Sequence, residues 1–145
     1  MANRVIAIDG PAGSGKSTVA RAVADRLGLE YLDTGAMYRG VAFAVLRRGV
    51  DPADVPAVAD VARSVVLEVT RSACIVDGED ASAAIRGAEV TTAVTAVAAN
   101  PEVRVEMVAR QRAWVAEHGG GVMEGRDIGS VVFPEIGRAS CRERV

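Results

Sequence analysis

A glycine-rich stretch near the amino end constrains this chain more than any other feature of its sequence. Residues 10–17, GPAGSGKS, fit the pattern G-x-x-x-x-G-K-[ST] at every fixed position and directly follow the apolar run 5–8. Glycines let such a loop approach a ligand closely, and its inward N–H groups at the start of a helix favour an anion. A plain turn between a strand and a helix would explain neither Lys16 nor Ser17. The pattern therefore predicts a loop that holds the phosphates of a nucleoside triphosphate.

The residues of this loop have distinct expected roles. Lys16 would bridge the β- and γ-phosphates and so act in catalysis, and Ser17 would place its hydroxyl on Mg²⁺. The expected nucleotide-binding residues are the eight of the pattern and the threonine that follows: Gly10, Pro11, Ala12, Gly13, Ser14, Gly15, Lys16, Ser17 and Thr18.

Composition favours one compact domain with an aliphatic core. Of 145 residues, 50% are hydrophobic but only 3% aromatic, so Ala, Val, Leu and Ile must fill the core, as in layered α/β proteins. The net charge is −2 without a long run of like charge, which argues against a general nucleic-acid or membrane-surface binder. Cys74 and Cys141 lie outside any metal-ligand spacing, and the apolar run at the amino end is neither a signal peptide nor a membrane span. We therefore expect a cytoplasmic protein with reduced cysteines.

Hydrophobic periodicity predicts alternating strands and helices in the first third of the chain. The runs 5–8 and 29–32 are typical of buried parallel strands, and a helix is expected after each of them. The first helix would end at Gly28 and the second before Gly49. The expected apolar stripes are Val19, Val23 and Leu27 in the first helix and Met37, Val41 and Val45 in the second. This order of elements predicts an α/β fold with a parallel sheet.

The hydrophobic periodicity changes in the middle of the chain. Asp54 is expected to start a short helix that runs to about residue 65, and the runs 66–70 and 73–76 predict a small antiparallel insertion. Residues 88–99 leave helix and strand undecided because β-branched side chains dilute the helix propensity. A further helix is expected from 102 to about 117.

Charged residues framed by glycines follow a brief apolar step at 122–123. In an open α/β sheet, ligands collect at the carboxyl ends of the strands, so the segment 124–129, EGRDIG, is expected to face the phosphate loop. The alternative interpretation is an ordinary polar turn.

Three motifs together resemble the bacterial cytidylate kinase family: the phosphate loop, LDTGAMYR at 32–39 and GRDIG at 125–129. The resemblance covers about residues 4–134. It implies a three-layer P-loop kinase core in which a small nucleoside monophosphate-binding subdomain is inserted at about 63–100. It also implies phosphoryl transfer from ATP, with Mg²⁺, to CMP or dCMP. The implied partners are these nucleotides, without nucleic acid or membrane, for a protein that acts as a monomer.

The resemblance assigns the acceptor nucleotide to a further set of residues. These expected substrate-binding residues are Asp33, Thr34, Tyr38, Arg39, Thr95, Arg104, Arg126 and Asp127. Arg39 offers a planar fork for the CMP phosphate. Thr95, Arg104 and Asp127 could read the amino donor and ring acceptors of cytosine. Tyr38 could equally be an aromatic side chain packed on a helix face.

Charge at the transferring group would come from the segment 124–129. Arg126 is expected to stabilise the transferring or acceptor phosphate, with Asp127 beside it as a catalytic residue. Glu124 could hold a water on Mg²⁺, as the acid of a Walker B strand does. Two acidic groups near a phosphate repel it unless a metal ion or an arginine intervenes, so Mg²⁺ is required. His118, at the end of a helix, and Trp114 are expected to be structural.

The resemblance ends after Phe133 and Pro134. Family members continue with another core strand and an arginine-bearing lid, whereas residues 135–145 show no clear strand pattern. We expect this tail to be artefactual or disordered, and the 145-residue chain to be weak or inactive for want of the lid. The alternative is that Arg138, Arg142 and Arg144 replace the lid arginines.

Two other functions stay open. Another small P-loop kinase, which acts on AMP, shikimate or dephospho-coenzyme A, would share the loop at 10–17 but not the motifs at 32–39 and 125–129. A non-catalytic nucleotide-binding module would bind ATP without any acceptor, although the chain lacks the N-K-x-D segment of a GTPase switch. The preference among CMP, dCMP and UMP also stays open.

Overall fold

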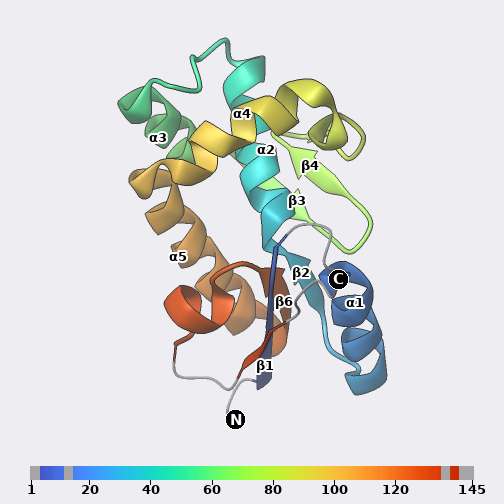
Figure 1. Ribbon diagram of the computed structural model, residues 1–145. Coiled ribbons are helices and arrows are strands. Elements are labelled where there is room, and N and C mark those ends of the chain that lie inside the picture. Colours follow the sequence, from blue (N-terminus) through green and yellow to red (C-terminus); the bar gives the residue numbers. More distant parts are fainter. Residues whose placement is uncertain (1–3, 12–14, 135–137, 141–145) are drawn as a thin grey trace. The chain divides into compact units, whose positions relative to one another are not determined.

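The computed structural model describes residues 4–11, 15–134 and 138–140 (Figure 1). The chain divides into two compact units, residues 1–34 with 110–145 and residues 35–109. Each unit is described by itself.

The first unit is built on a parallel sheet of strand order β2-β6-β1-β7. The strands are β1 (Arg4–Asp9), β2 (Tyr31–Asp33), β6 (Gly120–Gly125) and β7 (Arg138–Ser140). Glu124 of β6 pairs with Ile8 of β1 on one side and with Asp33 of β2 on the other. The carboxyl ends of these three strands therefore meet at one edge, which confirms the predicted α/β fold with a parallel sheet.

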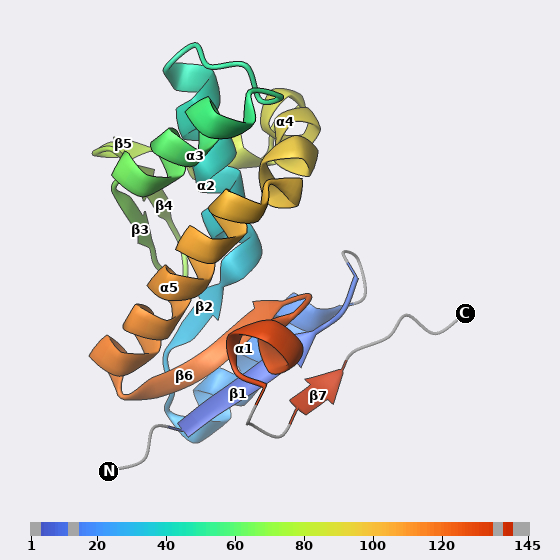
Figure 2. The same ribbon diagram turned by 90° about the vertical axis from the view of Figure 1, so that its left-hand side faces the viewer.

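Strand β7 differs from the sequence prediction. Residues 138–140 pair in parallel with Ala7, Ile8 and Asp9 of β1, and Figure 2 shows the two strands side by side. The sequence shows no clear strand pattern after residue 134, and this strand forms because the edge of β1 offers unpaired N–H and C=O groups to any extended chain.

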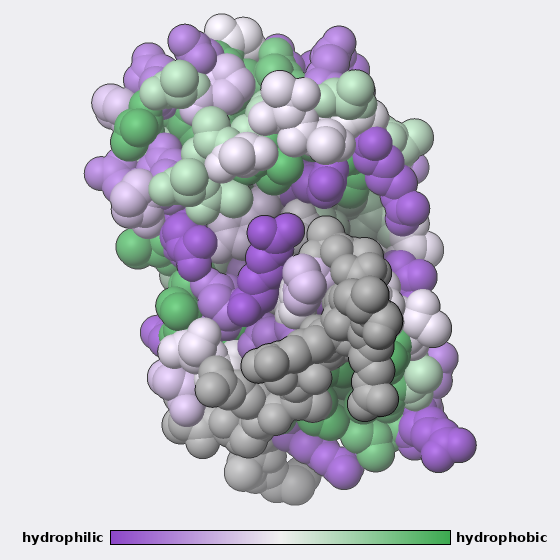
Figure 3. Space-filling view, viewed as in Figure 1, coloured by the Kyte–Doolittle hydropathy of each residue, from purple (hydrophilic) through white to green (hydrophobic). Residues whose placement is uncertain are grey.

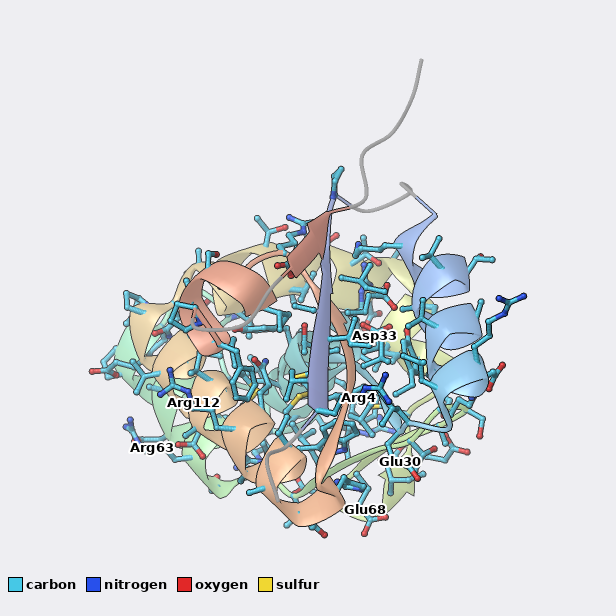
Figure 4. All side chains as sticks on the ribbon, turned by 90° about the horizontal axis from the view of Figure 1, so that it is seen from below. Arg4, Glu30, Asp33, Arg63, Glu68 and Arg112 are labelled. Carbon is cyan, nitrogen blue, oxygen red and sulfur yellow. The ribbon has the colours of Figure 1, made fainter. Side chains whose placement is uncertain are left out.

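Helix α1 (Lys16–Leu27) covers one face of this sheet (Figures 1 and 4). Ala20 and Ala24 are fully buried in a cluster with Ile8, Tyr31 and Val122. The predicted stripe is therefore wrong for two of its members, which are exposed: Val19 and Leu27. Val23 is partly buried against the cluster, as predicted. The alanines bring the helix backbone close to the sheet, and the larger side chains lie beyond the contact.

The other face of the sheet carries the last turns of α5 (Pro101–His118) and the single wide helical turn η2 (Ile128–Val132) (Figure 4). Arg112 of α5 donates to the carbonyl oxygen of Val132 at 3.0 Å. The Trp114 ring packs on Gly121 of β6, where a Cβ atom would come within 2.5 Å of it. Trp114 stacks on His118, the last residue of the helix. Both residues thus have the structural roles expected of them.

The second unit consists of helices around a small antiparallel sheet. Its elements are most of α2 (Thr34–Arg47), then α3 (Val55–Ser64), β3 (Leu67–Val69), β4 (Cys74–Val76), β5 (Glu79–Asp80), η1 (Ala84–Arg86), α4 (Ala88–Ala99) and the first turns of α5. The predicted stripe Met37, Val41 and Val45 is buried. Asp54 caps α3 through a hydrogen bond from the Ala57 N–H, as predicted. The undecided segment 88–99 is helical.

The predicted antiparallel insertion is confirmed and gains a third strand. β3 pairs with β4, and β4 pairs with β5. Asp77 and Gly78 form the turn before β5, with φ values of 49° and 83°. The sheet packs closely on α2 at Gly40, where a Cβ atom would lie 2.9 Å from Leu67. A larger residue at position 40 would therefore separate the helix from the sheet.

Several large apolar side chains are exposed among the described residues. On the face drawn in Figure 3, hydrophilic and hydrophobic residues are interspersed over the coloured surface. The exposed large apolar side chains are Val19 and Leu27 of α1, Val55, Val66, Val105 and Val131. Within the described part of the chain, no helix has the length and apolar character needed to span a membrane.

Candidate active site

The candidate site lies in the first unit, where the chain leaves the carboxyl ends of β1, β2 and β6. The Gly10 N–H donates to the Gly125 carbonyl oxygen at 3.1 Å, so the entry of the phosphate loop touches the last residue of β6. This contact places the start of the segment 124–129 beside the first residue of the phosphate loop. Ala12, Gly13 and Ser14 lie outside the described residues.

The described part of the phosphate loop leads directly into α1. Gly15 is the residue before the helix, with a φ of 81°. The Lys16 ammonium group donates to the carbonyl oxygen of Pro11 at 3.2 Å, so it lies over the loop. A flexible cation in this place can transfer its hydrogen bond from a loop carbonyl to a phosphate oxygen.

Glu124 is the central acidic group of the site. Its side chain is buried, with the residue 4% exposed, and one carboxylate oxygen accepts a hydrogen bond from the Ser17 hydroxyl. The other oxygen accepts from the Tyr31 hydroxyl. Burial, followed by the hydrogen bond to Glu124, raises the pKa of Tyr31 well above its ordinary value. Tyr31 therefore stays protonated and holds the carboxylate in place.

These oxygens suit a magnesium ion. Mg²⁺ is held in kinase sites by one or two protein oxygens, while waters and substrate phosphates complete its coordination. The contact between the Ser17 hydroxyl and the Glu124 carboxylate supplies the hydroxyl–carboxylate pair predicted from the sequence. No group of three His, Cys, Asp or Glu side chains gathers as a metal site among the residues that are described. The donor set thus fits a shared Mg²⁺–phosphate site rather than a protein-only metal site.

Close packing fixes the segment that follows Glu124. The Thr34 hydroxyl donates to the Glu124 carbonyl oxygen at 2.7 Å. A Cβ atom at Gly125 would lie 2.6 Å from the Thr34 hydroxyl oxygen and 2.9 Å from the Ile128 side chain. Thr34, expected to bind the acceptor, therefore also holds the strand end. Asp33 lies beside it at the end of β2 and is partly buried (Figure 4).

Arg126 and Asp127 lie on the short segment between β6 and η2. Arg126 is exposed and Asp127 is partly buried. The Asp127 carbonyl oxygen accepts from the Val131 N–H at 2.8 Å at the start of the helical turn. Both residues directly follow Gly125, whose carbonyl oxygen accepts from Gly10.

Two residues of this region were missed by the sequence reasoning. Asp9 is buried, and its two carboxylate oxygens accept from the backbone N–H groups of Ile128 at 2.9 Å and Gly129 at 2.8 Å. Tyr31 is the buried partner of Glu124. Asp9 could have been identified from the sequence, because it is a charged residue at the end of an apolar strand. Nothing in the sequence pairs Tyr31 with Glu124, because 93 residues separate them.

The other four residues predicted to bind the acceptor belong to the second unit. Arg39 donates to the Ile85 carbonyl oxygen at 2.9 Å and to the Thr91 hydroxyl at 3.0 Å. Tyr38 is partly buried, while Thr95 on α4 and Arg104 on α5 are exposed. The structure therefore brings Lys16, Ser17, Asp33, Thr34, Glu124, Arg126 and Asp127 together within one unit and places these four residues in the other.

The sequence matches known proteins over most of its length. The sequence profile of the family described as cytidylate kinase matches residues 6–137. The chain belongs to the cytidylate kinase family.

Individual relatives give the same assignment. A cytidylate kinase of Mycobacterium leprae (strain Br4923) is 51% identical over 135 residues, which cover 93% of this chain and 60% of the relative. A cytidylate kinase of Mycobacterium avium (strain 104) is 50% identical over 138 residues, which cover 92% and 60%. A bifunctional pantoate ligase/cytidylate kinase of Parasynechococcus marenigrum (strain WH8102) is 52% identical over 136 residues, which cover 90% of this chain and 27% of the relative. The chain thus spans about 60% of the length of the cytidylate kinases it matches.

Proposed function

We propose that this chain binds ATP with Mg²⁺ and transfers the γ-phosphoryl group to CMP or dCMP. The observation that carries the proposal is the contact between the Ser17 hydroxyl and the buried Glu124 carboxylate beside the phosphate loop. Together they form the metal-binding half of a phosphoryl-transfer site. The relatives named cytidylate kinase supply the acceptor.

The transfer needs positioning and charge rather than covalent chemistry. One oxygen of the CMP phosphate attacks the γ-phosphorus, the bond from that phosphorus to the β,γ-bridging oxygen breaks, and the products are ADP and CDP. Lys16 and the N–H groups of the phosphate loop would hold the β- and γ-phosphates. Ser17 and Glu124 would hold Mg²⁺, which neutralises charge on these phosphates when bound. Arg126 would stabilise the negative charge that the equatorial oxygens carry in the transition state.

The acceptor would be held by the residues that the family resemblance assigns. Arg39 would exchange its present hydrogen bonds to Ile85 and Thr91 for the CMP phosphate, a stronger charge-assisted partner. Thr95, Arg104 and Asp127 would read the cytosine edge, while Asp33, Thr34 and Tyr38 would complete the nucleotide contacts. Uracil lacks the amino donor of cytosine, so a UMP complex would leave buried polar groups unpaired.

We propose that the chain works in the cytoplasm as a monomer, with nucleotides as its partners and without nucleic acid. The inserted subdomain at about 63–100, and weak turnover by these 145 residues, also stay predictions. A coupled assay of the purified chain measures that turnover.

An acceptor panel with γ-labelled ATP tests the proposed reaction. The chain should form labelled CDP or dCDP faster than labelled products from UMP, AMP, shikimate or dephospho-coenzyme A, even if every rate is low. Label that passes preferentially to AMP, shikimate or dephospho-coenzyme A would replace the proposal with another small P-loop kinase. ATP binding without transfer to any acceptor would favour the non-catalytic module.

A further inference from the structure

Asp9 joins the two loops of the candidate site and has no role in the reaction proposed above. It is the last residue of β1 and immediately precedes the phosphate loop. Its carboxylate accepts from Ile128 at 2.9 Å through one oxygen and from Gly129 at 2.8 Å through the other. The side chain is buried, with the residue 9% exposed.

A third hydrogen bond runs in the opposite direction across the same junction. The N–H of Gly10 donates to the Gly125 carbonyl oxygen, and Asp9 faces Gly125 in the strand register. Residues 125 and 128–129 are therefore both fixed to the chain at residues 9–10. The segment between these anchors contains only Arg126 and Asp127.

The chemistry of the junction requires a carboxylate. Two backbone N–H groups point at the two oxygens of Asp9, and both are donors that need an acceptor. An asparagine offers only one acceptor oxygen and would turn its NH₂ group toward the second N–H. One donor would lose its partner, and a buried donor without a partner is costly.

We propose that Asp9 is a positioning residue that fixes Arg126 and Asp127 relative to the phosphate loop. The inference rests on the proposed function, which assigns Asp127 to the cytosine edge of the acceptor and Arg126 to the phosphoryl group in transfer. Asp9 uses both of its carboxylate oxygens on backbone N–H groups. It sets the distance between the residues that hold the donor phosphates and those that receive the acceptor, and in-line transfer depends on that distance.

The variant Asp9→Asn tests this role with two readouts. Amide hydrogen exchange should show Ile128 or Gly129 exchanging at least roughly tenfold faster than in the parent chain, because a hydrogen bond to a charged group is lost. Calorimetry should show CMP affinity falling by about tenfold while Mg²⁺–ATP affinity changes less than about threefold. The matched control is Asp54→Ala, which removes the cap of α3 in the other unit. It should lower stability without an unequal loss of CMP and Mg²⁺–ATP affinity.

The possible outcomes separate the two proposals. Unchanged exchange at both amides, or equal losses of ATP and CMP affinity, would overturn the positioning role alone. The same unequal loss in Asp54→Ala would also overturn it, because general destabilisation would then explain the split. A parent chain that fails to bind CMP would overturn the proposed function and the positioning role together. Faster exchange with a selective loss of CMP affinity would establish the role.

Discussion

At the residue scale, the buried Glu124 carboxylate can bind a cation but lowers the stability of the fold. A buried carboxylate without a cation is unfavourable in a folded protein. Its partners in the structure are the hydroxyl groups of Ser17 and Tyr31, while the Lys16 ammonium contacts Pro11 instead. The negative charge therefore remains available to a divalent cation that arrives with a nucleotide.

The variant Glu124→Gln separates stability from function. Glutamine keeps the shape, and both hydroxyl partners can donate or accept, so the variant should melt at the same or a higher temperature than the parent chain. Mg²⁺ should then no longer strengthen ATP binding, because the anionic ligand is gone. Thermal melting and ATP titrations with and without Mg²⁺ measure both effects, with Glu117→Gln at the exposed end of α5 as the control. A variant that keeps the Mg²⁺ effect would show that Glu124 is not a ligand of the ion.

At the scale of elements, the hairpin of the second unit depends on an ionised turn residue. Asp77 accepts from the Val66 N–H at 2.9 Å and from the Arg48 guanidinium at 3.0 Å. These two contacts, the backbone hydrogen bond first, lower the pKa of Asp77. A carboxyl group whose pKa is lower in the folded than in the unfolded chain stabilises the fold above its unfolded pKa. That contribution disappears as the pH falls through the folded pKa.

The variant Asp77→Asn isolates this charge, because asparagine tolerates the positive φ and can still accept from Val66. The free energy of unfolding should be lower for the variant than for the parent at pH 7. The difference should shrink below about pH 4, the ordinary range of an aspartate. Denaturant unfolding at a series of pH values measures it, and Glu68→Gln on the neighbouring strand is the control. A difference that stays constant down to pH 2 would mean that the charge of Asp77 contributes nothing.

The order of the elements could be predicted from the sequence, but several contacts between them could not. Strands 5–8 and 29–32 and the helix with Met37, Val41 and Val45 follow from local periodicity. The prediction for α1 was wrong because hydrophobic periodicity favours large apolar side chains as the buried face. The close contact between the helix and the sheet instead selects the small side chains of Ala20 and Ala24.

The site shows the same division between local pattern and tertiary contact. The phosphate loop carries its own signature in eight consecutive residues, so Lys16 and Ser17 could be assigned directly. The bond from Asp9 to Gly129 joins residues 120 positions apart, and no local pattern specifies such a partner. Strand β7 was likewise missed because pairing with an open edge depends on backbone groups more than on side chains.

At the scale of the whole molecule, the assigned residues are shared between the two units. Those for the donor nucleotide and metal lie in the first unit, whereas Tyr38, Arg39, Thr95 and Arg104 lie in the second. Ligands that use different residues should therefore protect different parts of the chain.

Hydrogen exchange with each nucleotide added separately tests this distribution. Mg²⁺–ATP should slow exchange mainly in the first unit, around β1, β6 and the start of α1. CMP should add protection in the second unit, in α2 near Arg39 and in α4 near Thr95. Binding at saturating ligand, about 100 times Kd, stabilises by about 2.7 kcal/mol, which is large enough to detect by exchange. CMP protection confined to the first unit would contradict the assignment of Arg39, Thr95 and Arg104.

Calorimetric titration of Mg²⁺–ATP into the folded chain tests the central claim most directly, since every assignment depends on a phosphate-binding loop at residues 10–17. The account predicts saturable binding at one site per chain. Lys16→Ala should weaken it by roughly tenfold to a hundredfold, as expected for the loss of a charge-assisted hydrogen bond. Arg26→Ala, which removes an exposed charge from the last turn of the same helix, should change it little. An absence of binding heat, or equal affinities for the parent chain and Lys16→Ala, would contradict the account.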